Sequence, residues 1–209
     1  KAEYKPENAK LEWALTILTT LGVIALLAPG LIVWNKFVTV PDDAVDIEVM
    51  GQQWMWSYRL TGKDGILGTT DIRNINDDNP FGLNLDDSHG YDDILISGDD
   101  LHLLIDQPVK VNLRSIDVLH DFYIPQFRAK MDMVPGLITY YWFTPIRTGN
   151  FEILCAEYCG TGHYAMQGRA LVDEEEDYHN WLDEQMTFEE MLASNDNSDL
   201  LKLASSVRE

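Results

Sequence analysis

The chain has 209 residues, which allows one compact domain together with a membrane anchor. Its formal net charge of −20 and its pI near 4.4 argue against nucleic acid and anionic lipid as partners, and favour a cationic partner or a salt-rich environment. The sequence contains no C-x-x-C-H motif, which excludes a covalently attached c-type haem.

A polar segment, residues 1–12, precedes an apolar stretch that begins at Trp13 and ends at Trp34. This stretch of 22 residues carries no charged side chain, so it is long enough to cross a hydrocarbon core of about 30 Å. Tryptophan at both ends is typical of the two interfaces of a membrane. We therefore predict a transmembrane helix over residues 13–36, bent at Pro29–Gly30. The excess of lysines before it predicts an N-terminus on the inner side.

From residue 37 the pattern is that of strands. Residues 45–50 alternate apolar and acidic side chains, as expected for a strand with one buried face. Turn residues separate five further predicted strands, at 101–105, 109–113, 138–144, 150–155 and 168–172. Such a series is typical of an all-β sandwich. The aromatic stretch Gly51–Tyr58 is interpreted, from the residues alone, as core packing or as a girdle near the membrane.

Two acidic segments accompany these strands. Residues 61–100, here called the excursion, contain ten acids and two bases, which predicts a surface loop rather than a pair of strands. We expect its carboxylates, Asp92 and Asp93 among them, to be exposed; a docking lobe and a solvated insertion both remain open. Residues 173–209 contain twelve acids and two bases with helical spacing, and Thr187–Glu190 resembles a capping box. They predict an acidic tail of one or two helices.

The residues that carry chemistry gather in one stretch, from Cys155 to Met166, which holds both cysteines of the chain. The spacing C-x3-C alone is compatible with a disulfide, a metal site or a redox pair of thiols. His163 and Met166 continue the pattern as C-x3-C-x3-H-x2-M, and two thiolates, an imidazole and a thioether form a soft ligand set that selects copper. Upstream, Asp-Val-Leu-His places His120 after a predicted strand, so two loops at one end of a sandwich would bring it beside the cysteines.

The order of these motifs resembles subunit II of the haem–copper cytochrome c oxidases. The resemblance rests on DVLH, IPQF, KMDMVPG and CAEYCGTGHYAM, and runs from about Leu11 to Leu171. With the apolar patterns above, it implies a mainly β fold: a cupredoxin-like Greek-key sandwich anchored by one N-terminal transmembrane helix, with an acidic helical tail. Only the second of the family's two transmembrane helices is matched. The implied domains are an inner polar segment, the helix, a CuA domain containing the excursion, and the tail: 1–12, 13–36, 37–172 and 173–209.

The resemblance implies a dinuclear copper centre, CuA. Its implied ligands are two thiolates, two imidazoles, a thioether and a backbone carbonyl, from His120, Cys155, Glu157, Cys159, His163 and Met166. The two cysteines bridge the copper ions, and His120 and Met166 complete one of them. His163 and the carbonyl of Glu157 complete the other. The carboxylate of Glu157 is implied to reach a magnesium ion shared with subunit I, because a hard oxygen ligand suits that cation.

Two further positions take roles from the resemblance. Trp54, in the pattern G-x-Q-W-x-W-x-Y at 51–58, corresponds to the surface residue at which electrons enter above the copper. Glu12, just before Trp13, corresponds to an acid at the inner mouth of a proton-conducting channel of subunit I. From the residues alone, Glu12 is an interfacial carboxylate that the helix dipole stabilises.

The implied function is that of the electron-transfer subunit of a respiratory oxidase. Its CuA domain accepts electrons from cytochrome c or an equivalent donor, and haem in subunit I then reduces oxygen to water while protons are pumped. The expected partners are subunit I, other oxidase subunits, the donor and the membrane, with no nucleic acid. The implied location is a bacterial plasma membrane or the mitochondrial inner membrane, with CuA on the periplasmic or intermembrane-space side. The alternative is a membrane-anchored thiol or copper-delivery protein with a redox C-x3-C pair and a thioredoxin-like fold.

Overall fold

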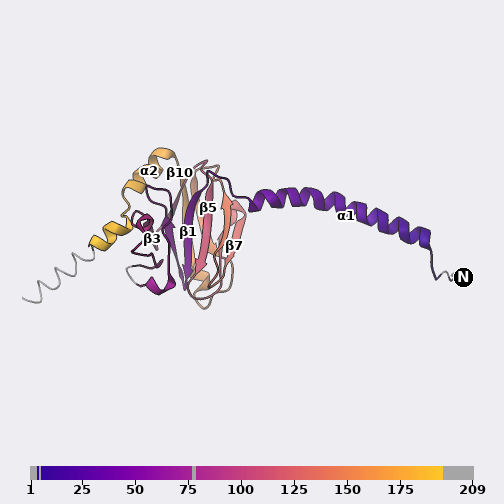
Figure 1. Ribbon diagram of the computed structural model, residues 1–209, viewed down its shortest axis with the longest axis horizontal. Helices are drawn as coiled ribbons and strands as arrows, with labels where there is room; N and C mark the ends of the chain where they lie inside the picture. The colour runs from indigo at the N-terminus through magenta and orange to yellow at the C-terminus, as the bar shows by residue number, and fades with distance from the viewer. Residues whose placement is uncertain (1–3, 5, 77–78, 195–209) are drawn as a thin grey trace, which may run out of the picture. The chain divides into compact units, whose positions relative to one another are not determined.

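The computed structural model describes residues 4, 6–76 and 79–194, and it divides into two compact units, Lys1–Val40 and Pro41–Glu209. The first unit holds a single helix, α1 (Ala9–Val38), drawn in indigo in Figure 1. The second unit holds two packed sheets and the chain that follows them.

Helix α1 has the properties of a membrane span. It is 30 residues long, none of its side chains is buried, and its best 18-residue window has a mean hydropathy of 2.2. A helix that is apolar on every side is typical of a segment surrounded by lipid. The side chain of Asn8 caps its first turn by accepting a hydrogen bond from the backbone N–H of Leu11 at 3.2 Å. This cap starts the helix four residues before the predicted Trp13, and the helix continues through Pro29 to Val38.

Two five-stranded sheets form the sandwich (Figure 1). The first sheet has the order β3-β2-β1-β5-β8, and the second has the order β4-β10-β9-β6-β7. In that order, the strands of the first sheet are Ile94–Ser97, Met55–Leu60, Val45–Gln52, Val109–Ser115 and Thr139–Phe143. The strands of the second sheet are Leu101–Leu104, Gln167–Asp173, Gly149–Cys155, His120–Ile124 and Ala129–Met133.

The predicted alternation of side chains is visible in β5. Val109, Val111 and Leu113 are buried, and the residues between them are only partly buried, because successive side chains of a strand point to opposite faces. The predicted sandwich is therefore confirmed, and the six predicted strands match observed ones within two residues at each end. Four strands were not predicted: β2, β3, β6 and β7. Strand β2 is buried from Trp56 to Leu60, so it lacks the alternation that reveals a half-buried strand.

Strand pairing brings the predicted site residues to one end of the sandwich. Strands β1 and β5 run parallel, with Gly51 opposite Ser115, so the segments that follow both strands meet at the same end. Strand β6 starts at His120 and pairs antiparallel with β9, where Phe122 lies opposite Cys155. The end of β9, the start of β6 and the turn after β1 therefore lie together.

The excursion differs from the prediction of an exposed surface loop in two respects. Its last part is strand β3, which pairs with β2 and places Ser97 opposite Ser57. It also has buried side chains, among which Phe81, Leu83 and Asp93 are 0% exposed. The excursion therefore packs against the first sheet through an interior of its own, and Asp93 is not a surface charge.

Buried ion pairs attach the excursion to the sandwich. Arg59 on β2 donates to the carboxylate of Glu48 at 2.7 Å and to that of Asp93 at 2.9 Å. It also donates to the carbonyl of Gly68 at 2.8 Å, and Arg114 on β5 donates to Glu48 at 2.8 Å. We call Glu48, Arg59, Asp93 and Arg114 the Arg59 network. Such a network stays intact only if each buried charge keeps its partner.

The C-terminal segment packs on the excursion. After β10 comes helix α2 (Glu175–Asp183), and a further helical turn covers residues 188–194. The predicted capping box is present, because Thr187 and Glu190 exchange hydrogen bonds between backbone N–H and side-chain oxygen at 2.9 and 3.3 Å. Phe188 is buried, and its N–H donates to the carbonyl of Asp93 at 2.8 Å. Residues 195–209 of the predicted tail lie outside the described residues.

Candidate metal centre

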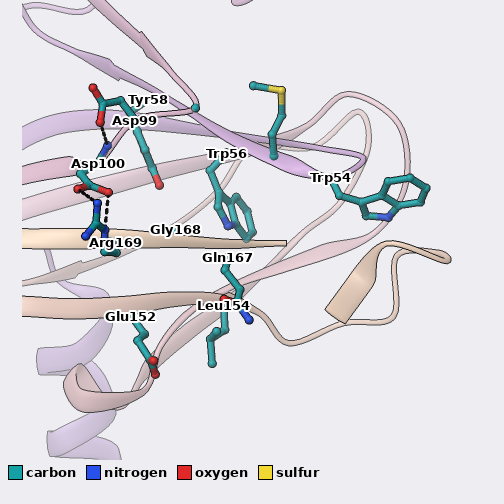
Figure 2. A pocket seen from close by; sticks show the side chains of 12 residues that line it. Trp54, Trp56, Tyr58, Asp99, Asp100, Glu152, Leu154, Gln167, Gly168 and Arg169 are labelled. Carbon is teal, nitrogen blue, oxygen red and sulfur yellow. Dashed lines mark hydrogen bonds and ion pairs between the residues drawn. The ribbon is translucent and has the colours of Figure 1, made fainter. Parts of the chain in front are cut away.

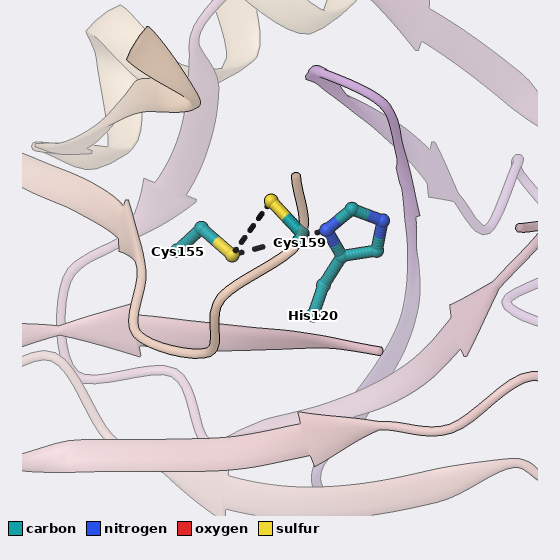
Figure 3. Close-up of side chains that lie close together, drawn as sticks. All are labelled: His120, Cys155 and Cys159. Atoms are coloured by element: carbon teal, nitrogen blue, oxygen red, sulfur yellow. Dashed lines mark hydrogen bonds between the residues drawn. The ribbon is translucent and has the colours of Figure 1, made fainter. Parts of the chain in front are cut away.

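Three side chains that are far apart in the sequence meet at the end of the sandwich. The Nδ1 atom of His120 lies 3.8 Å from the Sγ atom of Cys155, which lies 3.7 Å from the Sγ atom of Cys159. All three residues are buried, and their ligand atoms lie within 4.8 Å of one another. Figure 3 shows them facing one common point, with His120 supplied by β6 and the cysteines by the end of β9 and the loop after it.

The other predicted ligands surround the same sulfur atoms. The Sγ atom of Cys159 lies 3.5 Å from Nδ1 of His163 and 3.8 Å from Sδ of Met166. The carbonyl oxygen of Glu157 lies 3.1 Å from Sγ of Cys155. The structure therefore brings together all six residues that the sequence singled out.

The donor atoms fit copper and do not fit a disulfide. Both cysteines are free, and the distance of 3.7 Å between their sulfur atoms is much longer than the S–S bond of about 2.05 Å in a disulfide. Sulfur and imidazole ligands suit copper, whereas magnesium and calcium prefer oxygen. Burial, together with the hydrogen bond from Cys155, raises the pKa of Cys159 to about 11. A metal ion must therefore displace a proton from this thiol when it binds at neutral pH.

The carboxylate of Asp117 supports the centre from outside, and the sequence reasoning did not single it out. Its Oδ1 atom lies 2.9 Å from Nε2 of His120, and its Oδ2 atom accepts the backbone N–H of Gln53 at 2.7 Å. Burial raises the pKa of Asp117, but the hydrogen bonds from His120, Gln53 and Val118 outweigh it and hold the pKa below its usual value. The signal was present in the sequence, because Asp117 is the first residue of the DVLH motif.

Trp54 lies against the loop that holds the ligands. Its indole N–H donates to the carbonyl of Cys159 at 3.3 Å, and its side chain is 39% exposed. A Cβ atom on Gly162 would lie 2.3 Å from the indole ring, so only glycine leaves room for it. Gly160 has a φ of +121°, a conformation that glycine adopts without strain. These two glycines allow an exposed aromatic ring to contact the ligand loop directly.

A hollow of about 490 Å³ lies beside this ring. Figure 2 shows Trp54 at its outer end and Trp56 further in, with Asp100 paired to Arg169 on the far side. Trp56 is buried, and its ring meets the ring of His120 edge-on with centroids 6.3 Å apart. The two tryptophans of the W-x-W pattern therefore differ. Trp54 is partly exposed and lies against the ligand loop, whereas Trp56 is buried and packs against the predicted ligand His120.

The two glutamates of the prediction lie in different units. The Glu157 side chain is exposed, and among the described residues its carboxylate has no hydrogen bond or ion pair. Glu12 lies in the first turn of α1, where it accepts the N–H of Asn8 at 3.2 Å. Two other histidines pair with carboxylates elsewhere: His89 with Asp64 and His102 with Asp173, both at 2.6 Å.

Comparisons with known proteins agree with this geometry. The family model described as "Cytochrome C oxidase subunit II, periplasmic domain" matches residues 45–170. The chain belongs to this family. It is 63% identical to the alternative cytochrome c oxidase subunit 2 of Bradyrhizobium diazoefficiens, over 90% of this chain and 68% of the relative. It is 30% identical to cytochrome c oxidase subunit 2 of Cereibacter sphaeroides, over 85% of this chain and 61% of the relative.

A solved structure supports the fold. The periplasmic domain of subunit II of cytochrome oxidase from Bradyrhizobium japonicum superposes with a TM-score of 0.50 at 23% identity, and the match covers 69% of this chain and 95% of that one. The chain is therefore a membrane-anchored subunit of the cytochrome c oxidase family, and residues 45–170 match the family's periplasmic domain. The alternative of a thioredoxin-like copper-delivery protein is not favoured, because the described fold is a sandwich of two sheets.

Proposed function

We propose that this chain is the electron-transfer subunit of a haem–copper oxidase, with a dinuclear copper centre at the end of its sandwich. The observation that carries the proposal is the gathering of two imidazoles, one thioether and one carbonyl around the sulfur atoms of Cys155 and Cys159. In this proposal the two cysteines would hold both metal ions. His120 and Met166 would complete the ligands of one ion, and His163 and the Glu157 carbonyl would complete those of the other.

Each ligand residue has a task that follows from its surroundings. Cys155 and Cys159 release their protons on binding, because the thiolate is the form that ligates. Met166 is 1% exposed and His120 is 0% exposed, so these two side chains keep water away from the sulfur atoms. Copper held by these residues would supply a centre that takes up and releases one electron. The buried ligand residues would favour rapid transfer, because they are already gathered around the sulfur atoms.

Trp54 is proposed as the place where electrons enter. It combines an exposed ring, which a donor protein can touch, with a hydrogen bond to the backbone of Cys159. A donor docked over Trp54 would therefore be separated from a ligand residue by one side chain and one hydrogen bond. The proposed donor is cytochrome c or an equivalent carrier with a positive docking surface, since the chain has a net charge of −20.

The remaining roles concern the complex. Subunit I is proposed to receive the electron at its haem, reduce oxygen to water and pump protons, with other oxidase subunits as further partners. The exposed carboxylate of Glu157 would hold magnesium together with subunit I, and Glu12 would lie at the mouth of a proton channel. We place the subunit in a bacterial plasma membrane, because two of its relatives are bacterial and the family domain is periplasmic.

The test is the metal content of the full chain, purified in detergent and reconstituted with copper. We expect two copper ions per chain and an electron paramagnetic resonance spectrum of one electron shared by both. Cys159→Ser removes one bridge with almost no change in volume, and it should abolish the shared-electron spectrum. A shared-electron spectrum that survives in Cys159→Ser contradicts the proposal. One copper per chain, or none, supports the copper-delivery alternative.

A further inference from the structure

Asp117 is joined to two separate parts of the site by hydrogen bonds. One carboxylate oxygen, Oδ1, faces Nε2 of His120 at 2.9 Å. The other, Oδ2, accepts the backbone N–H of Gln53 at 2.7 Å. Oδ1 also accepts the N–H of Val118 at 2.7 Å. The carboxylate therefore connects a predicted copper ligand to the turn that carries Trp54, across 64 positions of sequence.

The geometry selects one tautomer of His120. A carboxylate only accepts hydrogen bonds, so the ring nitrogen that faces Asp117 must carry the proton. That nitrogen is Nε2, which leaves the lone pair of Nδ1 free on the side that faces Cys155. Ligating histidines commonly donate their other N–H to a carboxylate, and this contact fixes both the tautomer and the ring orientation. Because His120 is 0% exposed, water does not compete for the same nitrogen.

The second half of the connection runs through Gln53. Its backbone N–H is held by Asp117, and its side-chain amide donates to the carbonyl of Cys159 at 2.8 Å. The indole of Trp54, the next residue, donates to the same carbonyl at 3.3 Å. Asp117 and Gln53 thus connect His120, on one strand, to Cys159, on the ligand loop, with Trp54 fixed between them.

We propose that Asp117 is a positioning residue of the metal centre: it presets His120 with Nδ1 directed at the metal and holds the Gln53–Trp54 turn on the ligand loop. The effect of Asp117 on copper binding rests on the proposed function, whereas the tautomer of His120 is a property of the chain without metal. The plainer alternative is that Asp117 only shapes its own loop through Val118. Asparagine can maintain that local contact with its single carbonyl oxygen, but it cannot then also accept from both His120 and Gln53.

The first measurement uses the metal-free full chain in detergent with ¹⁵N-labelled histidine. We expect the nuclear magnetic resonance signals of His120 in the parent to report a proton on Nε2 and none on Nδ1. A parent in which Nδ1 carries the proton overturns the proposal, whatever any variant does. In Asp117→Asn we expect a mixture of the two tautomers.

The second measurement compares copper release to a chelator and the reduction potential of the loaded chain. Loss of a carboxylate behind a ligating histidine typically weakens metal affinity by about 10–100-fold, so we expect Asp117→Asn to release copper faster by a similar factor and with a shifted potential. Asp117→Glu keeps the acceptor and should restore much of the affinity. The matched control is Asp99→Asn, which removes the same charge from an exposed residue beside the Trp54 hollow.

The two measurements distinguish a failure of the proposed role of Asp117 from a failure of the proposed copper function. If Asp117→Asn and Asp99→Asn release copper at the same rate and with the same potential, Asp117 does not position the ligand. If the parent binds no copper but shows the Nε2-protonated tautomer, the proposed function fails while the preset histidine stands. Circular dichroism of each variant establishes that the sandwich is retained before the rates are compared.

Discussion

The metal centre and the excursion both place polar side chains in the interior, but they balance them differently. In the Arg59 network, which joins the excursion to the sandwich, the buried carboxylates of Glu48 and Asp93 face the guanidinium of Arg59, so the chain supplies both charges. At the metal centre, two thiols, two imidazoles and a thioether face one another with no cationic side chain of Lys or Arg among them. One cluster balances its charges with side chains of the chain itself, and the other presents ligand atoms that suit a metal ion.

This difference separates architecture from function. A buried charge that is balanced within the chain stabilises the fold only while its partner remains. A buried set of ligand atoms without an internal cation indicates a site for one. If the two regions are independent, changes at the metal end should alter electron transfer without unfolding the domain. Changes in the Arg59 network should lower the stability of the domain without altering the copper spectrum.

The largest effect is expected at Trp54. Trp54→Ala removes the exposed ring that connects a docked donor to the Cys159 carbonyl, so reduction by the natural donor should slow by orders of magnitude. The copper spectrum should remain, because Trp54 is not a ligand. Stopped-flow reduction of the loaded full chain measures the rate, and Tyr164→Ala, which removes an aromatic side chain that is 82% exposed near the same loop, is the control. An unchanged rate in Trp54→Ala would place the uptake of electrons elsewhere.

The opposite result is expected in the Arg59 network. Arg59→Met leaves two buried carboxylates without their shared cation, which costs about 3–5 kcal/mol of unfolding free energy. Thermal unfolding of the full chain, followed by circular dichroism, should show a clearly lower midpoint. Below that midpoint the copper spectrum should match the parent. Arg73→Met breaks an exposed pair with Asp71 on the same excursion and should leave the midpoint unchanged. Equal midpoints for the two variants would contradict the assignment.

The sequence singled out residues that the structure brings together at the metal end, for a physical reason. Five of the six predicted ligand residues lie within one segment of twelve residues, and the sulfur and imidazole atoms among them indicate the metal class without any knowledge of the fold. Asp117 was missed because a carboxylate in a motif gives no sign of which distant atom it accepts from. Its partner Gln53 comes from another strand end, and only the parallel register of β1 and β5 brings the two together.

The excursion was predicted poorly for the converse reason. Its composition is polar, and polarity favours a solvated loop whenever the partners of the charges are unknown. The cation that pairs with Asp93 is Arg59 on β2, and Arg114 on β5 donates to the hydroxyl of Thr70. The sequence of the excursion itself does not reveal these partners. Strand β3 was missed together with them, because its four residues, Ile94–Ser97, form too short a run to show a period.

A smaller effect is expected from the pH dependence of stability. Burial raises the pKa of Asp93 to about 6, although the Arg59 guanidinium acts in the opposite direction. Between about pH 4 and pH 6 the folded state then binds more protons than the unfolded state, so this carboxyl stabilises the fold fully below about pH 4 and loses that contribution as the pH rises through about 6. A pKa difference of about 2 corresponds to about 3 kcal/mol at most.

The metal-free full chain tests this expectation, since copper binding has its own pH dependence. The difference in unfolding midpoint between the parent and Asp93→Asn should change between about pH 4.5 and about pH 7, with the parent losing relative stability at the higher pH. Asp71→Asn is the control, because hydrogen bonds from Arg73 lower the pKa of Asp71 to about 2, so this carboxyl stays ionised across the range. A difference that does not vary with pH means that Asp93 is ionised throughout this range.

The smallest effect concerns the attraction of the donor, and it depends on whether an acidic side chain is buried or exposed. Asp93 is fully buried against Arg59, so it contributes little to a field outside the molecule. Asp99 and Glu152 are exposed and line the hollow beside Trp54, so they face an approaching donor. We expect the double variant Asp99→Asn/Glu152→Gln to lower the association rate with a cationic donor a few-fold, and Asp93→Asn to leave it unchanged. The effect should shrink as salt rises, because charges are screened over about 8 Å at physiological ionic strength. Stopped-flow reduction at several salt concentrations measures both. An association rate that does not vary with salt concentration would mean that the donor reaches Trp54 without electrostatic steering. The acidity of this chain would then serve solubility.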